Sequence, residues 1–448
     1  MPSNVAGNSD TTSEGGSVSS LFQYDPQYER YKSLIATPLR DFKVYDAFTL
    51  VNEEEWEQLF TYHDQYITGR WELRGQTDWE IRQGIDPTKC LNSAKNFTTE
   101  AGGAKYNYEW QAVVAKCTNI LYGKFYNEPF EGAKDLKEIL LYWDENDILK
   151  NMNDRESTIN ANVATNMTYA VMSKVGQMMA HLSLYHRYYD LTEQEYLSID
   201  RMFTEFVTSY NYYKSFDRKG NFTRTVCNLS GKGDTVRTTN DHCGSFNLRI
   251  ATGATLYGLE FGNQTVYDYG IRKLEISLAT FDKHHGYSSQ MNRGTLALGY
   301  ARQMVGPMDQ LSYAFKKAFD FDFANMELHR GTSPNKVYVH LLKFAEDPSL
   351  FAHYHIADKR GKALPKYIEQ IKKGASPKIV WEAFNLNDYF VSGGSLARNN
   401  FPDKVQYYQL GGLGFMRSGC CQDHAMQIDS SILVGFNPYV LRDAIGSW

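Results

Sequence analysis

The sequence has no apolar run long enough to span a bilayer, which takes about 20 consecutive apolar residues. Its first residues also lack the basic segment followed by an apolar one that marks a signal peptide. The formal net charge is only −5, from 47 basic and 52 acidic residues, so no field of one sign covers the chain. We therefore expect a soluble protein that binds neither membranes nor nucleic acid, and in which an acidic ligand would need a local basic cleft.

Cysteine is scarce, and the six residues form no C-x-x-C pattern of the kind that binds zinc. Adjacent Cys420 and Cys421 are poorly placed to bridge each other, whereas two other pairs could form disulfides. These are Cys90 with Cys117 and Cys227 with Cys243. His353 and His355 could share one side of a strand, but no third metal ligand accompanies them. We predict a protein without a metal or a cofactor.

Proline is also sparse, with 12 residues, and no Pro-rich or Ser-rich linker interrupts the chain after residue 20. Residues 2 to 19 are small and polar, a composition that cannot form a core. Such a start fits a disordered leader or the exposed start of a mature secreted protein. We predict a leader over residues 1–20 and a single domain over residues 21–448.

Helices dominate what is present, because apolar residues recur at spacings of three and four from about Gln27 to Tyr389. Strand alternation is scarce before the last fifty residues, where Val405 to Met416 could be extended. The predicted helices are Asn52–Ile67, Tyr106–Tyr122, Ala133–Asp144, Thr158–Tyr188, Thr192–Lys214, Ser245–Glu260, Gln264–Phe281, Gly294–Val305, Met308–Phe319, Pro334–Glu346 and Tyr367–Lys373.

Successive helices without strands between them form a bundle, a solenoid or a closed ring of helical hairpins. A fixed repeat of 30 to 45 residues is missing, which disfavours the solenoid. Long polar and aromatic connections, Gly69 to Phe97 and Phe216 to Gly244, suit a toroid whose loops wall a cleft at one end. We predict an all-α dominated toroid.

The stretch Met291 to Tyr300 holds two groups that could work together. Arg293 and Tyr300 are seven residues apart, which on a helix is two turns and places both on one face. A permanent cation near a phenol favours the phenolate, so Tyr300 could act as a base. The axial separation is about 10 Å, so the two side chains must lean together to reach one small ligand.

Two polar residues elsewhere are candidates for the same site. His242 lies in a polar loop just ahead of a predicted helix that Ser245 could cap, where the positive end of the helix dipole favours an anion. A structural loop histidine is the alternative. Asn166 falls within a long, otherwise apolar helical pattern, either as a buried amide donor, which we favour, or as a glycosylated sequon. The N-x-S/T sequons begin at Asn96, Asn166, Asn221, Asn228 and Asn263, a number not clearly above chance.

Two of these motifs carry a family resemblance. R-G-T-L-A-L-G-Y, from Arg293 to Tyr300, resembles the R-G-x-x-A-L-x-Y signature of the alginate-lyase-like polysaccharide lyases. N-D-H, from Asn240 to His242, resembles their N-N-H motif at a compatible distance upstream. Lyases of polysaccharide lyase family 5 carry both motifs, and polysaccharide lyase family 38 is the closer overall match. The resemblance covers roughly residues 100 to 330.

The resemblance implies an (α/α) toroid of six or seven helical hairpins with few strands. It also implies metal-free β-elimination of 1,4-linked polyuronates, with Tyr300 as catalytic base and acid and His242 as the second catalytic residue. Arg293 and Asn166 would bind the uronate carboxylate. This sequence departs from the pattern after Asn240, since Asp241 replaces the second Asn of N-N-H.

The chemistry supports those roles independently. A uronate C5 proton is too weakly acidic to leave while the neighbouring carboxylate is charged, so Arg293, Asn166 and His242 must first neutralise it. Tyr300 titrates near about 10 unless nearby positive charge lowers its pKa. In β-1,4-linked mannuronate or glucuronate the C5 hydrogen and the C4 oxygen lie on one side of the ring, so one phenol can serve both. Guluronate would need a separate base.

Further substrate contacts are predicted for Asn240 and for the segment Gly69 to Arg82, whose Trp71 and Arg74 could grip an acidic sugar chain as a lid. A surface segment with a half-buried tryptophan is the alternative. The sequence thus favours a secreted, monomeric polysaccharide lyase with an acidic polysaccharide as its substrate. A glycoside hydrolase on the same toroid, with two carboxylates, and a non-catalytic carbohydrate-binding protein stay open as alternatives.

Overall fold

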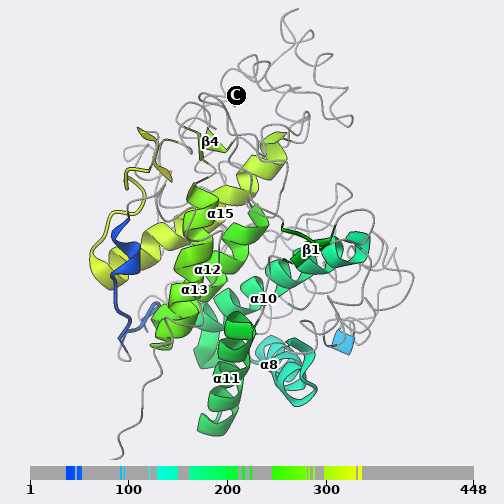
Figure 1. Cartoon of the computed structure of the whole chain (residues 1–448). Coiled ribbons are helices and arrows are strands. Elements are labelled where there is room, and N and C mark those ends of the chain that lie inside the picture. Colours follow the sequence, from blue (N-terminus) through cyan, green and yellow to red (C-terminus); the bar gives the residue numbers. More distant parts are fainter. Residues whose placement is uncertain are drawn as a thin grey trace, which may run out of the picture.

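Helices dominate the part of the chain that the computed structural model describes, as predicted (Figure 1). Described are residues 37–45, 48–52, 129–149, 161–209, 245–279 and 297–328, with short pieces at 91–92, 95, 121, 214–216, 222–224, 281–282, 286–287, 331–334 and 336. The helices are η1 (Pro38–Arg40), α8 (Pro129–Glu145), α10 (Ala161–Tyr189), α11 (Glu193–Ser209), α12 (Ser245–Glu260), α13 (Gln264–Leu278) and α15 (Ala297–Phe319).

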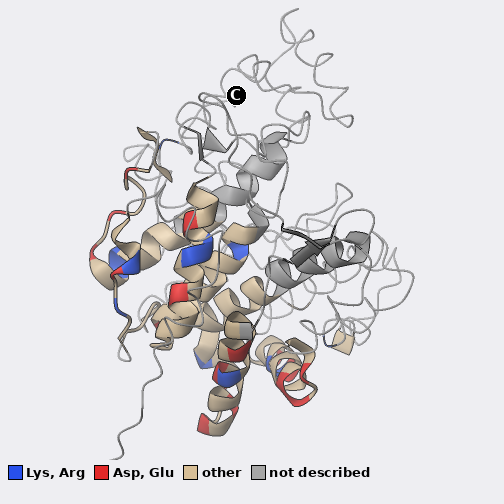
Figure 2. Ribbon diagram, viewed as in Figure 1, with Lys and Arg blue, Asp and Glu red and all other residues tan. Residues whose placement is uncertain are grey.

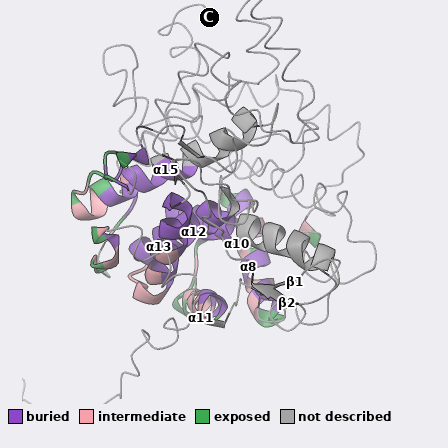
Figure 3. Cartoon of the chain, turned by 45° about the horizontal axis from the view of Figure 1, so that its top comes forward, coloured by how far each residue is buried: buried purple, intermediate pink, exposed green. Residues whose placement is uncertain are grey.

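Helix α12 is the centre of this part of the structure. It packs against α10, α13 and α15, and every residue from Asn247 to Glu260 is buried. Figure 3 shows the buried residues gathered along α12 and the faces turned towards it. Helices α8 and α11 carry charged residues along their length, whereas α12 contains only Arg249 and Glu260 (Figure 2). A helix without a polar face must lie inside the fold, and α12 does.

Helices α12 and α13 form an antiparallel hairpin across the connection Phe261 to Asn263. Asn263 caps α13, because its side chain accepts a hydrogen bond from the N–H of Val266 at 3.0 Å. Near the other end of the hairpin, Asn247 Nδ2 donates to Ser277 Oγ at 2.8 Å. The start of α12 therefore lies beside the end of α13.

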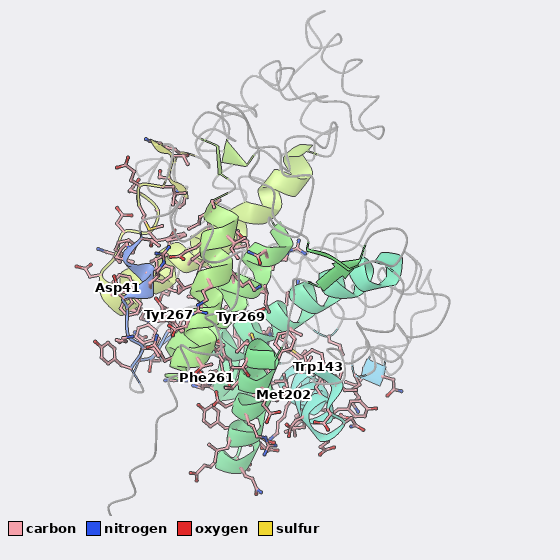
Figure 4. The ribbon with its side chains drawn as sticks, in the orientation of Figure 1. Asp41, Trp143, Met202, Phe261, Tyr267 and Tyr269 are labelled. Carbon is pink, nitrogen blue, oxygen red and sulfur yellow. The ribbon has the colours of Figure 1, made fainter. Side chains whose placement is uncertain are left out.

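The described N-terminal residues 37–45 and 48–52, here called the strap, bind to the ends of three helices. Tyr267 of α13 donates from its hydroxyl to the Leu39 carbonyl oxygen at 3.1 Å, and Figure 4 shows Tyr267 on the side of the strap. The ring of Phe42 stacks on that of Phe319 of α15, with centroids 4.3 Å apart. Leu50 is fully buried at the far end of the strap.

Among the described residues the strands are few and short, as expected. Strand β1 (Lys214–Phe216) pairs antiparallel with β2 (Phe222–Arg224), and β3 (Phe281–Asp282) pairs antiparallel with β4 (Gly286–Tyr287). Two helix predictions were too long for this reason: Lys214 lies in β1, and α11 already ends at Ser209, while Phe281 lies in β3.

A larger correction concerns α15, which we predicted as two helices, Gly294–Val305 and Met308–Phe319. The structure has one helix from Ala297 to Phe319 with Pro307 inside it. Proline removes one backbone hydrogen bond, but buried residues such as Met308 and Leu311 continue the apolar stripe beyond it. Packing of that stripe thus outweighs the local cost of proline. The helix α10 is also not uniform, since Tyr185 has non-helical angles (φ −128°, ψ 18°) and marks a kink.

Several predictions cannot be compared with the structure. The predicted leader (residues 1–20), the extended segment Val405–Met416, and the helices Asn52–Ile67 and Tyr367–Lys373 lie wholly or almost wholly outside the described residues. The single domain and the closed toroid remain predictions. Among the helices that the structure describes, none is both long enough and apolar enough to cross a membrane.

Candidate functional site

Two of the predicted site residues lie on described helices. Asn166 is the sixth residue of α10, and Tyr300 is the fourth residue of α15, so both are near the helix starts. His242 precedes the start of α12 by three residues, and Ser245, expected as a cap, is the first residue of that helix. The remaining predicted residues, His242 itself, Arg293, Asn240, Arg74 and Trp71, lie outside the described residues.

The C-terminal ends of α10, α12 and α15 meet at one place. His186 Nδ1, near the end of α10, lies 3.3 Å from Oε1 of Glu260, the last residue of α12. Glu260 Oε2 accepts a hydrogen bond from the N–H of Leu50 at 2.5 Å. The carbonyl oxygen of the same Leu50 accepts from Lys317 Nζ, near the end of α15, at 2.8 Å. One residue of the strap thus joins the ends of α12 and α15.

Helices α10 and α12 also touch at their middles, and this second contact fixes their relative direction. A Cβ on Gly176 would lie 2.7 Å from the Arg249 carbonyl oxygen, and one on Gly253 would lie 2.1 Å from the Gly176 carbonyl oxygen. Gly176 precedes His186, and Gly253 precedes Glu260. Both helices therefore run from the glycine contact towards the same end, and their N-terminal halves lie on the other side of it.

The start of α15 lies towards the same side as the start of α12. The end of α13 is beside the start of α12, and from there the chain passes through β3 and β4 to Ala297. Figure 1 shows α15 beginning on the side of β4 and ending beside the strap. Asn166 and Tyr300 therefore lie near the N-terminal starts of two helices whose C-terminal ends are gathered elsewhere, and α12, whose start follows His242 in sequence, also ends there.

This arrangement has an electrostatic consequence. Each helix N-terminus carries a partial positive charge equivalent to about half an elementary charge, with unpaired N–H groups that favour anions. The starts of α10 and α15, near which Asn166 and Tyr300 lie, are therefore positions at which an anionic ligand would be favoured.

Sequence reasoning missed four buried charged residues among those that the structure describes: Arg249, Glu260, Lys273 and Glu275. A signal was present for the first two, because they are the only charged residues in the otherwise apolar and small-residue sequence of α12. Glu275 had no such signal, since its partner Arg40 is 235 residues away in sequence. Within the described ranges, no group of three or more His, Cys, Asp or Glu is placed to hold a metal ion.

The comparisons with known proteins give structural likenesses only. Neither a protein-family model nor a curated protein sequence matches the chain. Alginate lyase A1-III from Sphingomonas species A1 is similar at a TM-score of 0.44 and 12% identity, over 74% of this chain and 79% of that one. The apo form of a histidine-to-alanine variant of alginate lyase A1-III gives 0.45 and 14% over the same shares.

A tyrosine-to-phenylalanine variant of alginate lyase A1-III, in complex with a tetrasaccharide, gives a TM-score of 0.40 and 11% identity. That likeness spans 56% of this chain and 61% of the other, which is less than two thirds of its length. Scores of this size do not establish a shared fold. Neither the architecture nor the activity proposed below rests on these likenesses.

Proposed function

We propose that the chain is a polysaccharide lyase that cleaves β-1,4-linked polyuronate, polymannuronate or glucuronan, by metal-independent β-elimination. The observation that carries the proposal is the pair of motifs Arg293 to Tyr300 and Asn240 to His242 in the order of the alginate-lyase-like lyases. A further observation in its favour is that Asn166 and Tyr300 both lie near the starts of their helices, α10 and α15. Membership of polysaccharide lyase family 38 and closure into an (α/α) toroid are parts of the same proposal.

In the proposed reaction, the uronate carboxylate is neutralised first. Arg293 supplies a charged fork and Asn166 an amide donor, while His242 contributes a donor or a cation. The three helix N-termini add to this positive environment. Neutralisation makes the C5 proton acidic enough to remove, because the negative charge that develops is spread into the hydrogen-bonded carboxylate. This step carries the largest energetic demand of the reaction.

Tyr300 then takes the C5 proton as phenolate and returns it to the C4 oxygen as that bond breaks, leaving a C4–C5 double bond on the new non-reducing end. The proton transferred to the leaving oxygen is the one taken from C5, so no water or metal-bound hydroxide is consumed. Asn240, Arg74 and Trp71 would hold the neighbouring sugars. We propose a secreted monomer as the working form.

The test is an incubation with polymannuronate, glucuronan and polyguluronate, followed by ultraviolet absorbance of the unsaturated uronate that only elimination produces. Tyr300→Phe should abolish turnover while substrate binding is largely kept. Tyr313→Phe is the matched control, because Tyr313 is on the same helix but its hydroxyl bonds to the Leu50 carbonyl oxygen of the strap at 3.4 Å. This control should keep full turnover.

Other outcomes of this incubation would support one of the two alternative functions. New reducing ends without the absorbance would indicate a glycoside hydrolase, and binding without either signal would indicate a carbohydrate-binding protein. An active Tyr300→Phe chain would refute the assignment of the phenol. Activity is also expected to persist after exhaustive chelation, and a loss that a divalent cation restores would contradict the metal-free mechanism.

A further inference from the structure

Glu260 ends α12 in surroundings that disfavour a negative charge. Its side chain is 4% exposed, and it stands at a helix C-terminus, where the dipole is negative. The next residue, Phe261, labelled in Figure 4, packs its ring against those of Tyr257 and His186, at centroid distances of 4.6 and 5.9 Å. An ionised Glu260 would lose its hydration here, and the helix dipole would not compensate for that loss.

The contacts of Glu260 suit a neutral carboxylic acid. Oε2 accepts the hydrogen bond from the Leu50 N–H, and Oε1 lies 3.3 Å from His186 Nδ1, a buried nitrogen that has no hydrogen bond in the structure. If His186 is neutral with its own proton on Nε2, a proton on Oε1 would place a donor beside this nitrogen. An ionised Oε1 would place only a second acceptor there.

The charged groups near Glu260 come from two helices. His186 and Arg187 approach from α10 and Lys317 from α15, while the strap contributes the backbone of Leu50. Lys317 Nζ donates to the carbonyl oxygen of Leu50 and, at 3.3 Å, to the hydroxyl of Tyr313. This lysine therefore acts on the strap directly and on Glu260 only through its charge.

Burial raises the pKa of Glu260 to about 8, although the Leu50 N–H and the charges of Lys317 and Arg187 act in the opposite direction. Burial, together with the charge of Arg187, lowers the pKa of His186. The two directions agree with the geometry, since both favour neutral side chains at this buried contact.

We propose that Glu260 is a proton-dependent latch: the strap closes over the carboxyl group in its neutral form, and loss of the proton leaves a buried charge that favours release of the strap. The latch is independent of the proposed lyase activity. Glu260 and Leu50 contact each other where the C-terminal ends of α10, α12 and α15 meet. Release of the strap would therefore remove contacts that hold these three helix ends together.

The direction of the pH effect follows from linkage. The protonated acid is favoured when the strap is closed, whereas in the open form Glu260 meets water and titrates near its ordinary value of 4.5. Between pH 4.5 and 8 the closed form therefore binds a proton that the open form has lost, and the closed form becomes less favourable as the pH rises. From pH 6 to pH 8 the opening equilibrium constant should rise about 50-fold.

Hydrogen exchange of the full chain, read by mass spectrometry on a peptide covering residues 43–52 and corrected for the intrinsic rate, measures this opening. The wild-type peptide should lose protection from pH 6 to pH 8, and the Glu260→Gln chain should keep the same protection at both. The glutamine side chain cannot ionise but can still hold both partners, because an amide copies the acceptor and the donor of the neutral acid.

Glu275→Gln is the matched control. Glu275 is the other buried carboxylate bound to the strap, where it accepts from Arg40 Nε at 2.8 and 3.0 Å. Its loss should lower protection at every pH and leave the pH dependence as in the wild type. Wild-type protection that does not change with pH, or a Glu260→Gln chain with the wild-type pH dependence, would overturn the latch. An equal pH dependence in a peptide from the core of α12 would also overturn the latch, because the exchange would then report unfolding of the whole chain and not release of the strap.

Discussion

Gly176 of α10 and Gly253 of α12 meet backbone to backbone, so closely that a Cβ on Gly253 would lie 2.1 Å from the Gly176 carbonyl oxygen. The missing side chains of the two glycines let the backbones of α10 and α12 approach each other directly at this crossing. The contact sits in the middle of both helices, between the end that carries Asn166 and the cluster at Glu260. It therefore sets how far apart the two N-terminal halves can be.

Gly253→Ala should destabilise the fold by about 1–3 kcal/mol, because the new methyl group meets backbone atoms that cannot rotate away. Helix propensity alone predicts the opposite sign, a stabilisation of up to about 1 kcal/mol when alanine replaces glycine inside a helix. Urea unfolding of the two chains decides between these effects. A variant as stable as the wild type would show that the helices can separate at little cost.

Gly176→Ala extends this prediction to the proposed activity. Its methyl group would lie 2.7 Å from the Arg249 carbonyl oxygen, so α10 must shift relative to α12. Gly270→Ala strains the other face of α12 to a similar degree, with contacts of 2.6 Å to Thr255. At an equal loss of melting temperature, Gly176→Ala should lower kcat more than Gly270→Ala, because α10 carries Asn166, which is predicted to contact substrate, whereas α13 carries no predicted site residue. Equal kcat values would contradict a positioning role for this crossing.

Arg40→Ala should cost about 3–5 kcal/mol in the free energy of unfolding, because it removes the cation bound to a carboxylate that is 0% exposed. Arg201→Ala provides the comparison, since Arg201 is 64% exposed and lies 3.4 Å from Asp144. That exposed pair should contribute less than about 1 kcal/mol. Chemical denaturation of both variants at one ionic strength measures the difference, and similar losses would show that Arg40 is not what stabilises buried Glu275.

The predictions that succeeded depend on local sequence. Apolar spacing placed α12 at Ser245–Glu260 with both bounds correct, and it placed Asn166 and Tyr300 on helices. Contacts between distant segments gave no such signal. The Gly176–Gly253 crossing joins residues 77 positions apart, and neither glycine differs in its surroundings from the other small residues of its helix.

The predictions that were wrong or missing also depend on contacts between segments far apart in sequence. A proline inside an apolar pattern predicts a helix boundary at Pro307, but the packing of α15 against α12 keeps the helix continuous. Burial of Glu260 likewise depends on the strap, which is 210 residues away in sequence. The roles of Tyr300, His242, Arg293 and Asn166 rest on motifs and chemistry, and they stay predictions.

His181 should make the fold less stable in acid. It is fully buried in α10, with Nδ1 2.6 Å from the Tyr189 hydroxyl, and burial holds its pKa well below the usual 6.5. Below pH 6.5 the unfolded chain binds a proton at this residue that the folded chain does not bind, so stability falls as the pH falls. The slope contributed by one such group is at most about 1.4 kcal/mol per pH unit.

The measurement is urea unfolding between pH 5 and 7.5, in a Glu260→Gln background so that the opposite effect of Glu260 is removed. His181→Phe keeps an aromatic ring beside Tyr185, whose centroid is 4.6 Å from that of His181, and it cannot titrate. The phenylalanine variant should lose less stability on acidification than its parent. A slope unchanged by the substitution would assign the acid sensitivity to other groups.

Asn263 both caps α13 and donates hydrogen bonds to α11, and two substitutions should separate the stability that each interaction contributes. Its Oδ1 caps α13, while its Nδ2 donates to Asp200 Oδ1 and Thr204 Oγ1 of α11, both at 2.8 Å. Asn263→Ala removes the cap and both donors and should cost about 2–3 kcal/mol. Asn263→Ser keeps a capping oxygen and should cost about 1 kcal/mol less, as measured by chemical denaturation. Equal losses would mean that the bonds to α11, and not the cap, stabilise the connection between α12 and α13.

The sequon at Asn263 should carry no glycan when the folded protein is produced in a glycosylating host. The reason is that Nδ2, the atom to which a glycan would be attached, donates both hydrogen bonds to α11. A glycan found at Asn263 by peptide mass analysis would contradict both hydrogen bonds.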